Sequence, residues 1–224
     1  MVLIAGGPTV DFFEPFEGEE FVYAGINNAF RSPKWKLRYL FTGDRWVSDI
    51  EQSEKIQKEL DEYEGDGCIK FYAYRNSMQI SRTHRDMKNV ENYYTAPNHY
   101  GLVYKKDLVD VKYAFPVDIS VSPIKAYETT AISAMQILLW MHPDEILLVG
   151  CDCSSGHGKS TYNEKNCDVC NMDFNFTEIK CNWELLKRFT DDFYPDIKIT
   201  SVNPVGLKGL FNDIYSDAYL QSEK

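Results

Sequence analysis

Long hydrophobic runs are absent from this sequence of 224 residues. The longest apolar stretch, around 132–141, is interrupted by Ser133 and Gln136, and the segment MVLIAGGPTV begins without basic residues and reaches glycine after a short apolar run. A membrane-spanning helix needs about 20 apolar residues, and a signal peptide needs a basic start and a longer apolar core. We therefore expect a cytoplasmic protein. Peripheral association with the inner face of a membrane stays open.

Basic residues are also in deficit, with 24 lysines and arginines against 34 aspartates and glutamates and a net charge of −10. This balance argues against nucleic acid as the main partner, because a phosphate backbone requires a basic surface. It does not exclude a small anionic ligand held by backbone amides, since such a site is local. Apolar residues make up 44% of the sequence, and no repeat or low-complexity linker divides it. We predict a single domain over 1–224.

Cysteines are few, and without a secretion signal they should be mostly reduced thiols. Of the six, four stand in two close pairs, Cys151 with Cys153 and Cys167 with Cys170, and His157 lies between the pairs. Two such pairs are compatible with a structural zinc site. The first pair, however, has C-x-C rather than C-x2-C spacing and directly follows an apolar run. The alternative is that the thiols only neighbour a ligand site, and our prediction includes no metal.

Two common nucleotide-binding motifs are missing. The glycine turn GGPTVDF, at 6–12, lacks the third glycine of the dinucleotide fingerprint, and no Walker A lysine motif occurs. A hydride-transfer enzyme and a P-loop kinase are therefore disfavoured. The turn still offers free amides and a hydroxyl that could receive a phosphate or a ribose.

Apolar runs alternate with helical patterns toward both ends of the sequence. Strands are predicted near 2–5, 21–24, 38–41, 68–74, 145–150 and 197–202. Helices are predicted near 48–65, 129–142 and 177–194. Residues 76–120 are less regular, and we expect loops and short elements there, as in a lid. This alternation predicts an α/β fold with a mostly parallel sheet and helices on both faces.

Small and polar residues follow the predicted strands, where sheets of this kind bind their ligands. These groups are Gly6-Gly7-Pro8-Thr9, Asn27-Asn28, Thr42-Gly43-Asp44, Gly150-Cys151-Asp152 and Asn203-Pro204. Each group alone could be an ordinary turn, because glycine, asparagine and aspartate all favour turns. Together they favour one ligand site at the carboxyl edge of the sheet.

Several segments together resemble a known enzyme family. In this sequence the segments are IAGGPTV, VYAGINNAF, ETTAISAMQILLWMHPDEILLVGCD, TEIK with WELLKRF, and ITSVNP. The bacterial sialyltransferases of glycosyltransferase family 42 have a similar order of segments. Archaeal 6-hydroxymethylpterin pyrophosphokinases, in the same Rossmann-like superfamily, look similar in the same segments. The resemblance covers about half of the chain and leaves out about 45–119. Its most specific part is the block at 129–152.

The resemblance implies a site for a CMP-linked sugar donor. The turn at 7–9 would lie along the donor, and Asn28 would bind its phosphate or ribose. Thr129 and Thr130 would contact the cytidine or the sugar carboxylate, and Asp152 would face the site. The predicted substrate-binding residues are Gly6, Gly7, Pro8, Thr9, Asn27, Asn28, Thr42, Asp44, Thr129, Thr130, Gly150, Tyr162 and Asn203.

The catalytic base is where this sequence departs from the family. The family's histidine precedes the helix that TEIK begins, and Asp173 stands there instead. A carboxylate can act as a base if the site keeps it ionised, but an acid there also suits the start of a helix. His157 is the alternative base, so the predicted catalytic residues are Asp173, His157 and Asp152. The family's glycine-turn asparagine is missing, and Tyr162 is the only counterpart of its phosphate-binding tyrosines.

Three functions remain open. The resemblance implies a glycosyltransferase that moves a CMP-linked acidic sugar to a surface glycan and requires no cofactor. The alternative is Mg2+-dependent pyrophosphate transfer to a pterin-like substrate, for which Asp44 and Asp152 could supply acidic ligands. The third is a non-catalytic nucleotide-binding domain. Assembly into a homo-oligomer also stays open.

Overall fold

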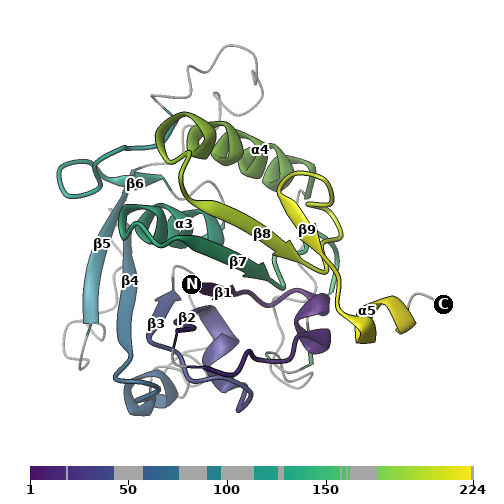
Figure 1. Cartoon of the computed structure of the whole chain (residues 1–224). Helices are drawn as coiled ribbons and strands as arrows, with labels where there is room; N and C mark the ends of the chain where they lie inside the picture. The colour runs from purple at the N-terminus through teal and green to yellow at the C-terminus, as the bar shows by residue number, and fades with distance from the viewer. Residues whose placement is uncertain are drawn as a thin grey trace.

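The computed structural model describes residues 1–18, 20–42, 58–75, 90–96, 114–125, 129–156, 158–159, 161 and 176–222. In this part of the chain nine strands form one sheet, in the order β6-β5-β4-β3-β2-β1-β7-β8-β9, and all neighbouring strands are parallel (Figure 1). The strands are β1 (Val2–Ile4), β2 (Tyr23–Ile26), β3 (Tyr39–Thr42), β4 (Ile69–Arg75), β5 (Val90–Ala96), β6 (Ile124–Lys125), β7 (Glu145–Val149), β8 (Lys198–Val202) and β9 (Asn212–Ile214).

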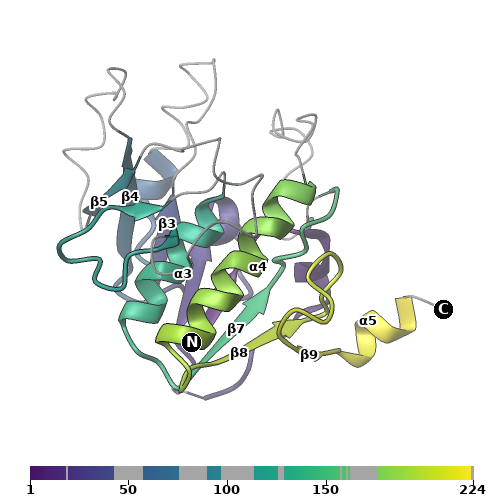
Figure 2. The ribbon, with the colours of Figure 1, turned by 90° about the horizontal axis from the view of Figure 1, so that it is seen from above.

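Helices lie on both faces of the sheet. They are the 3-10 helices η1 (Pro8–Phe12) and η2 (Asn27–Arg31), the α-helices α3 (Thr130–Trp140), α4 (Phe176–Phe193) and α5 (Asp217–Ser222), and a short helix at 58–62. α3 and α4 pack on one face, while η2 and the helix at 58–62 pack on the other (Figures 1 and 2). The predicted α/β, Rossmann-like fold is confirmed.

The alternation of side chains along β1 divides the core into two halves. Leu3 packs with α3 and α4, whereas Val2 and Ile4 pack with the elements on the opposite face. Successive side chains of a strand point to opposite faces, so both faces of this strand are buried. A parallel strand covered on both sides reads as a continuous apolar run, which is why the sequence predicted β1 well.

α3 is buried nearly all round, from Thr130 to Leu139, and only its last residue, Trp140, is exposed. Its buried Gln136 is satisfied because the side-chain amide accepts a bond from Lys125 N at 3.0 Å and donates to Lys125 O at 2.7 Å. These bonds attach β6 to α3. Within the described residues, no helix combines the length and the hydrophobicity that crossing a bilayer requires.

The middle of the chain differs from the sequence prediction. Residues 90–96, expected to be irregular, form β5, which pairs with β4 along its whole length. Residues 76–89 and 97–113 of the predicted lid lie outside the described residues, and 115–120 form bends and turns. Of the helix predicted at 48–65, the part at 58–62 is helical, and the part before 58 is likewise not described. The short elements β6, β9 and α5 were not predicted.

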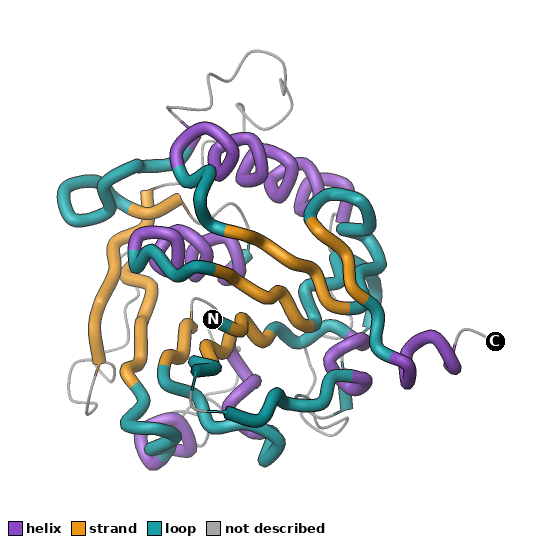
Figure 3. The backbone as a smooth tube through the Cα atoms, in the orientation of Figure 1, coloured by secondary structure: helices purple, strands orange, loops and turns teal. Residues whose placement is uncertain are grey.

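The strand order reverses between β1 and β7. From β1 the sheet extends through β2 to β6 in one direction and through β7 to β9 in the other (Figure 3). Because the strands are parallel, their carboxyl ends share one edge. α3 leads into the amino end of β7, so the helix runs opposite to the strands and begins at the carboxyl edge. Ligands of such sheets bind at the carboxyl edge beside the reversal.

Candidate functional site

The turn after β1 and the loop after β7 are bonded to each other at the strand reversal. Ala5 N donates to Val149 O and Gly7 N donates to Gly150 O, both at 2.8 Å. Gly150 has a φ of +66°, and a Cβ there would lie 2.7 Å from Ala5 O. This position therefore requires glycine, both for its left-handed backbone and for the close approach of the two segments.

Asp152 holds the start of η1. Its Oδ2 accepts a bond from Thr9 N at 2.8 Å, and its Oδ1 accepts one from the Thr9 hydroxyl. Gly7, at the N-cap position of η1, has no side chain to accept a bond, so Asp152 supplies the acceptor from a distant part of the chain. Burial raises the pKa of the Asp152 carboxyl, and the two bonds from Thr9 partly offset that rise.

These bonds give Asp152 and Thr9 a structural task. Both side chains are buried, each with 3% of its surface exposed. Both oxygens of Asp152 and the hydroxyl of Thr9 are used within the pair. The sequence correctly placed the two residues at the same edge of the sheet, but a ligand would have to displace these bonds to reach them.

The loop after β7 folds back over the glycine turn. Gly158 N donates to Gly6 O at 2.9 Å, and Lys159 N donates to Asp11 Oδ2 at 2.7 Å. Thr161 closes the segment by donating its hydroxyl to Gly158 O at 3.1 Å. The sequence did not single out this loop-to-turn docking, because nothing in either segment indicates which partner it meets.

Four predicted site residues cannot be placed. Asp44, His157, Tyr162 and Asp173 lie outside the described residues. Two of them are the candidate bases. The assignment of the base therefore stays a prediction.

Asn27 and Asn28 follow β2 and open η2, and both are buried. Asn27 adopts a φ of +49°, a left-handed conformation that asparagine tolerates better than most residues. Asn28 is only 3% exposed, yet its Oδ1 has no hydrogen-bond partner among the described residues. A buried acceptor without a partner is uncommon in folded proteins and calls for an explanation.

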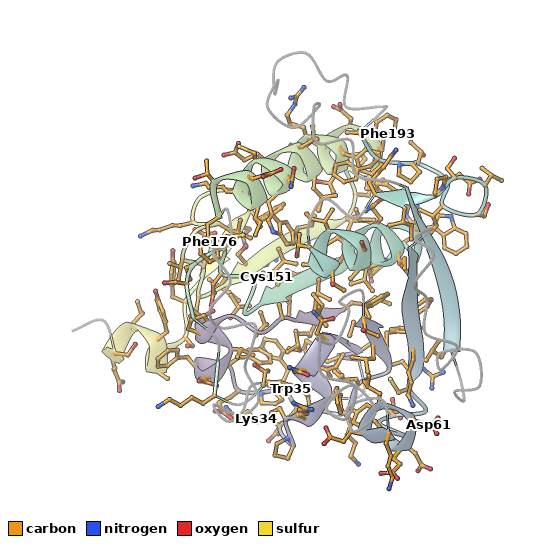
Figure 4. All side chains as sticks on the ribbon, turned by 180° about the vertical axis from the view of Figure 1, so that it is seen from behind. Lys34, Trp35, Asp61, Cys151, Phe176 and Phe193 are labelled. Carbon is orange, nitrogen blue, oxygen red and sulfur yellow. The ribbon has the colours of Figure 1, made fainter. Side chains whose placement is uncertain are left out.

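Lys34 and Trp35 contact the two 3-10 helices at this edge of the sheet, η1 and η2 (Figure 4). Lys34 Nζ donates to the carbonyl of Asp11 at 3.3 Å and to that of Phe13 at 3.2 Å, at the end of η1. Trp35 Nε1 donates to Ala29 O, in η2, at 2.8 Å. The backbone around the site is thus held by side chains from one short segment.

The start of α3 brings a second unpaired polar atom to the same edge. Thr129 caps the helix, its hydroxyl oxygen accepting a bond from Ala131 N at 3.2 Å. Thr130 is 7% exposed, and its Oγ1 has no hydrogen-bond partner within the part of the chain that the structure describes. The free amides at a helix N-terminus carry a partial positive charge and favour an anion.

The remaining predicted residues differ in availability. Thr42 ends β3 and is buried. Asn203, after β8, is fully used: its Nδ2 donates to Ser216 Oγ at 3.1 Å, and its Oδ1 accepts from Ser216 N at 2.8 Å. We therefore assign Asn203 to anchoring the segment before α5, rather than to holding a substrate.

Cys151 (Figure 4) and Cys153 are partly buried and pack against the core cluster that contains residues of α3 and α4. Burial raises the pKa of the Cys151 thiol, and it raises the pKa of Cys153 to about 12. Zinc binds thiolates, which these surroundings disfavour. No cluster of three or more His, Cys, Asp or Glu side chains suited to a metal occurs among the described residues. Cys167 and Cys170 lie outside them.

The two thiols should be slow to react in the folded protein. We expect iodoacetamide to alkylate Cys153 roughly a hundredfold more slowly than a free cysteine at neutral pH, because a pKa of about 12 leaves little thiolate. Peptide mass spectrometry after timed labelling measures this rate, and unfolding in urea should abolish the difference. Fast labelling of Cys153 in the folded protein would contradict its packing against the core.

Comparisons of this chain with protein-family models, with curated proteins and with solved structures returned no match.

Proposed function

We propose that this chain is a glycosyltransferase that takes a nucleotide-linked sugar, a CMP-linked acidic sugar, at the carboxyl edge of the sheet. The observation that carries the proposal is a pair of buried atoms at that edge, Asn28 Oδ1 and Thr130 Oγ1, that find no hydrogen-bond partner in the described ranges. Each such atom costs about 1–3 kcal/mol when nothing replaces its bonds to water. A ligand that supplies the missing hydrogen-bond partners would account for both buried atoms.

The two atoms favour different parts of such a ligand. Asn28 Oδ1 is an acceptor, so it suits a ribose hydroxyl or a base amino group rather than a phosphate. Thr130 Oγ1 lies in the first turn of α3, where a hydroxyl and free amides suit a phosphate or a carboxylate. A nucleotide linked to an acidic sugar offers both kinds of group.

The start of η1 is less suited to the anion. The carboxylate of Asp152 already accepts the bond from Thr9 N there, and its negative charge would repel a second anion. We therefore place the anionic group of the donor at α3 instead of at the glycine turn. In this proposal the glycine turn has a structural role beside the donor and does not bind its anionic group.

Catalysis in this proposal needs a base that activates the acceptor hydroxyl. Asp173 and His157 remain the candidates. Asp152 is less suited, since both of its oxygens are engaged by Thr9. The same engagement weakens the pyrophosphokinase alternative, in which Asp152 would be a Mg2+ ligand.

Thermal unfolding with nucleotides tests the proposal. We expect CMP and CDP to raise the melting temperature without added metal, because the ligand binds only the folded chain. Hydrolysis of a CMP-linked sugar, measured as the release of CMP, then tests turnover. Stabilisation by ATP only together with Mg2+ would favour pyrophosphate transfer. Stabilisation by CMP with no turnover of any CMP-sugar would favour the non-catalytic domain, and no response to any nucleotide would refute all three functions.

A further inference from the structure

The opposite, amino edge of the sheet carries exposed apolar side chains that the proposed function does not use. Of the eight large hydrophobic side chains exposed in the described residues, four are here: Val117, Val121, Trp140 and Phe193. Val121 is 79% exposed and Trp140 is 47% exposed. Val117 and Val121 precede β6, Trp140 ends α3, and Phe193 ends α4. All four therefore lie at the edge where the parallel strands begin. We call them the amino-edge patch.

Tyr194 joins the three segments that carry the amino-edge patch. Its hydroxyl donates to Val117 O at 3.0 Å, and its ring lies 5.2 Å from that of His142, just after α3. Tyr194 is itself buried and directly follows Phe193. The three segments that carry the patch are therefore joined to one another by ring packing and by a hydrogen bond.

Acidic side chains border the amino-edge patch. Asp118 follows Val117, Asp192 precedes Phe193, and Asp196 lies in the turn between α4 and β8. All three are exposed, and none is ion-paired within the described part of the chain. Asp118 Oδ1 accepts bonds from Ser120 N at 2.9 Å and from Ser120 Oγ at 2.6 Å, which fixes the carboxylate but leaves its negative charge without an opposite charge among the described residues.

The nearby lysines do not neutralise this border. Lys187 is paired with Asp191, one turn away on α4, at 2.6 Å. Lys198 is paired with Glu145, across the β7–β8 pair, at 2.8 Å. Arg188, one turn before Asp192 on α4, is a further exposed cation, but Asp118, Asp192 and Asp196 outnumber it, so the border of the patch keeps an excess of negative charge.

We propose that the amino-edge patch is a docking surface for a basic amphipathic protein segment, in which lysines or arginines alternate with apolar side chains. The apolar residues of that segment would cover Trp140 and its neighbours, and its cations would meet the carboxylates of the border. A second copy of this chain would bring like charges together, on a chain with a net charge of −10. An anionic lipid surface would be repelled for the same reason.

A synthetic helical peptide of leucine and lysine, labelled with fluorescein, is the probe that tests this surface. We expect its anisotropy to rise with the intact chain, and a peptide with glutamate in place of lysine to give no rise. Trp140→Ala should weaken binding about tenfold, because a buried aromatic anchor dominates such contacts. Val205→Ser, which changes an equally exposed residue at the carboxyl edge, should leave binding unchanged.

The charge requirement is tested separately with Asp192→Asn combined with Asp196→Asn. This variant should bind the basic peptide about threefold more weakly and with less dependence on salt. Circular dichroism checks that each variant is folded. Equal binding of both peptides, or full binding by Trp140→Ala, would overturn the proposal. A molar mass that doubles with concentration, and that Trp140→Ala lowers again, would also overturn it and would identify a second copy as the occupant. Sedimentation of the chain with anionic vesicles, if Trp140→Ala abolished it, would overturn the proposal in favour of a lipid surface.

Discussion

Replacing Asp152 with alanine is expected to lower the free energy of unfolding by about 3 kcal/mol, because it leaves two buried donors of Thr9 without an acceptor. One donor is the backbone N–H in the first turn of η1, which no other side chain caps. Urea unfolding followed by circular dichroism measures the change. Thr9→Val should cost about 2 kcal/mol, since it keeps the N–H bond but removes the hydroxyl from a buried carboxylate.

Thr9→Ser is the matched control. It retains both donors and should change stability by less than about 1 kcal/mol, the cost of one lost methyl group. A stable Asp152→Ala variant that lost all turnover would contradict the structural role and return Asp152 to catalysis. Equal losses in Thr9→Ser and Thr9→Val would show that the hydroxyl contributes nothing to the pair.

Replacing Thr130 with valine is expected to weaken nucleotide binding about tenfold while leaving stability unchanged or higher by about 1 kcal/mol. Valine has the shape of threonine, and it removes a buried hydroxyl for which the described residues supply no partner. Loss of binding without loss of stability would separate a ligand contact from a structural one. Calorimetric titration with CMP and urea unfolding give the two quantities.

Thr190→Val provides the comparison on α4. Thr190 is also a buried helical threonine, but its hydroxyl donates to Lys187 O at 2.7 Å. Its replacement should lower the free energy of unfolding by about 1 kcal/mol and leave CMP binding unchanged. If both threonine variants lost the same stability, Thr130 would have a partner in the unliganded protein. Unchanged CMP affinity in Thr130→Val would move the ligand away from α3.

The sequence predicted elements well where burial leaves a local pattern. β1 and β7 are covered on both faces and read as continuous apolar runs, and α4 repeats its apolar residues at the helical period. β5 was missed because a segment rich in Asn and Tyr carries no apolar run, and its pairing with β4 stands only in the tertiary structure. β6 and β9 have two and three residues, too few to show any period.

The candidate site divides in the same way. Asn28 was chosen because polar residues follow a predicted strand, and Thr130 was chosen because the family resemblance implies it. Both lie at the carboxyl edge, which the parallel strands share. The sequence could not distinguish them from Asn203 and Thr9, whose polar atoms are already bonded. Hydrogen-bond partners depend on which segments meet, and that is not a local property.

The sequence by itself determined that the chain is an acidic α/β protein with a parallel sheet and polar groups at the strand ends, since these properties follow from composition and period. Only the tertiary structure decided which of those groups are free. Thr9 and Asp152 are 143 positions apart, and their pairing closes the glycine turn while Thr130 is left without a partner. A bond across such a separation depends on how β1 and β7 come together, and no local pattern of residues records it.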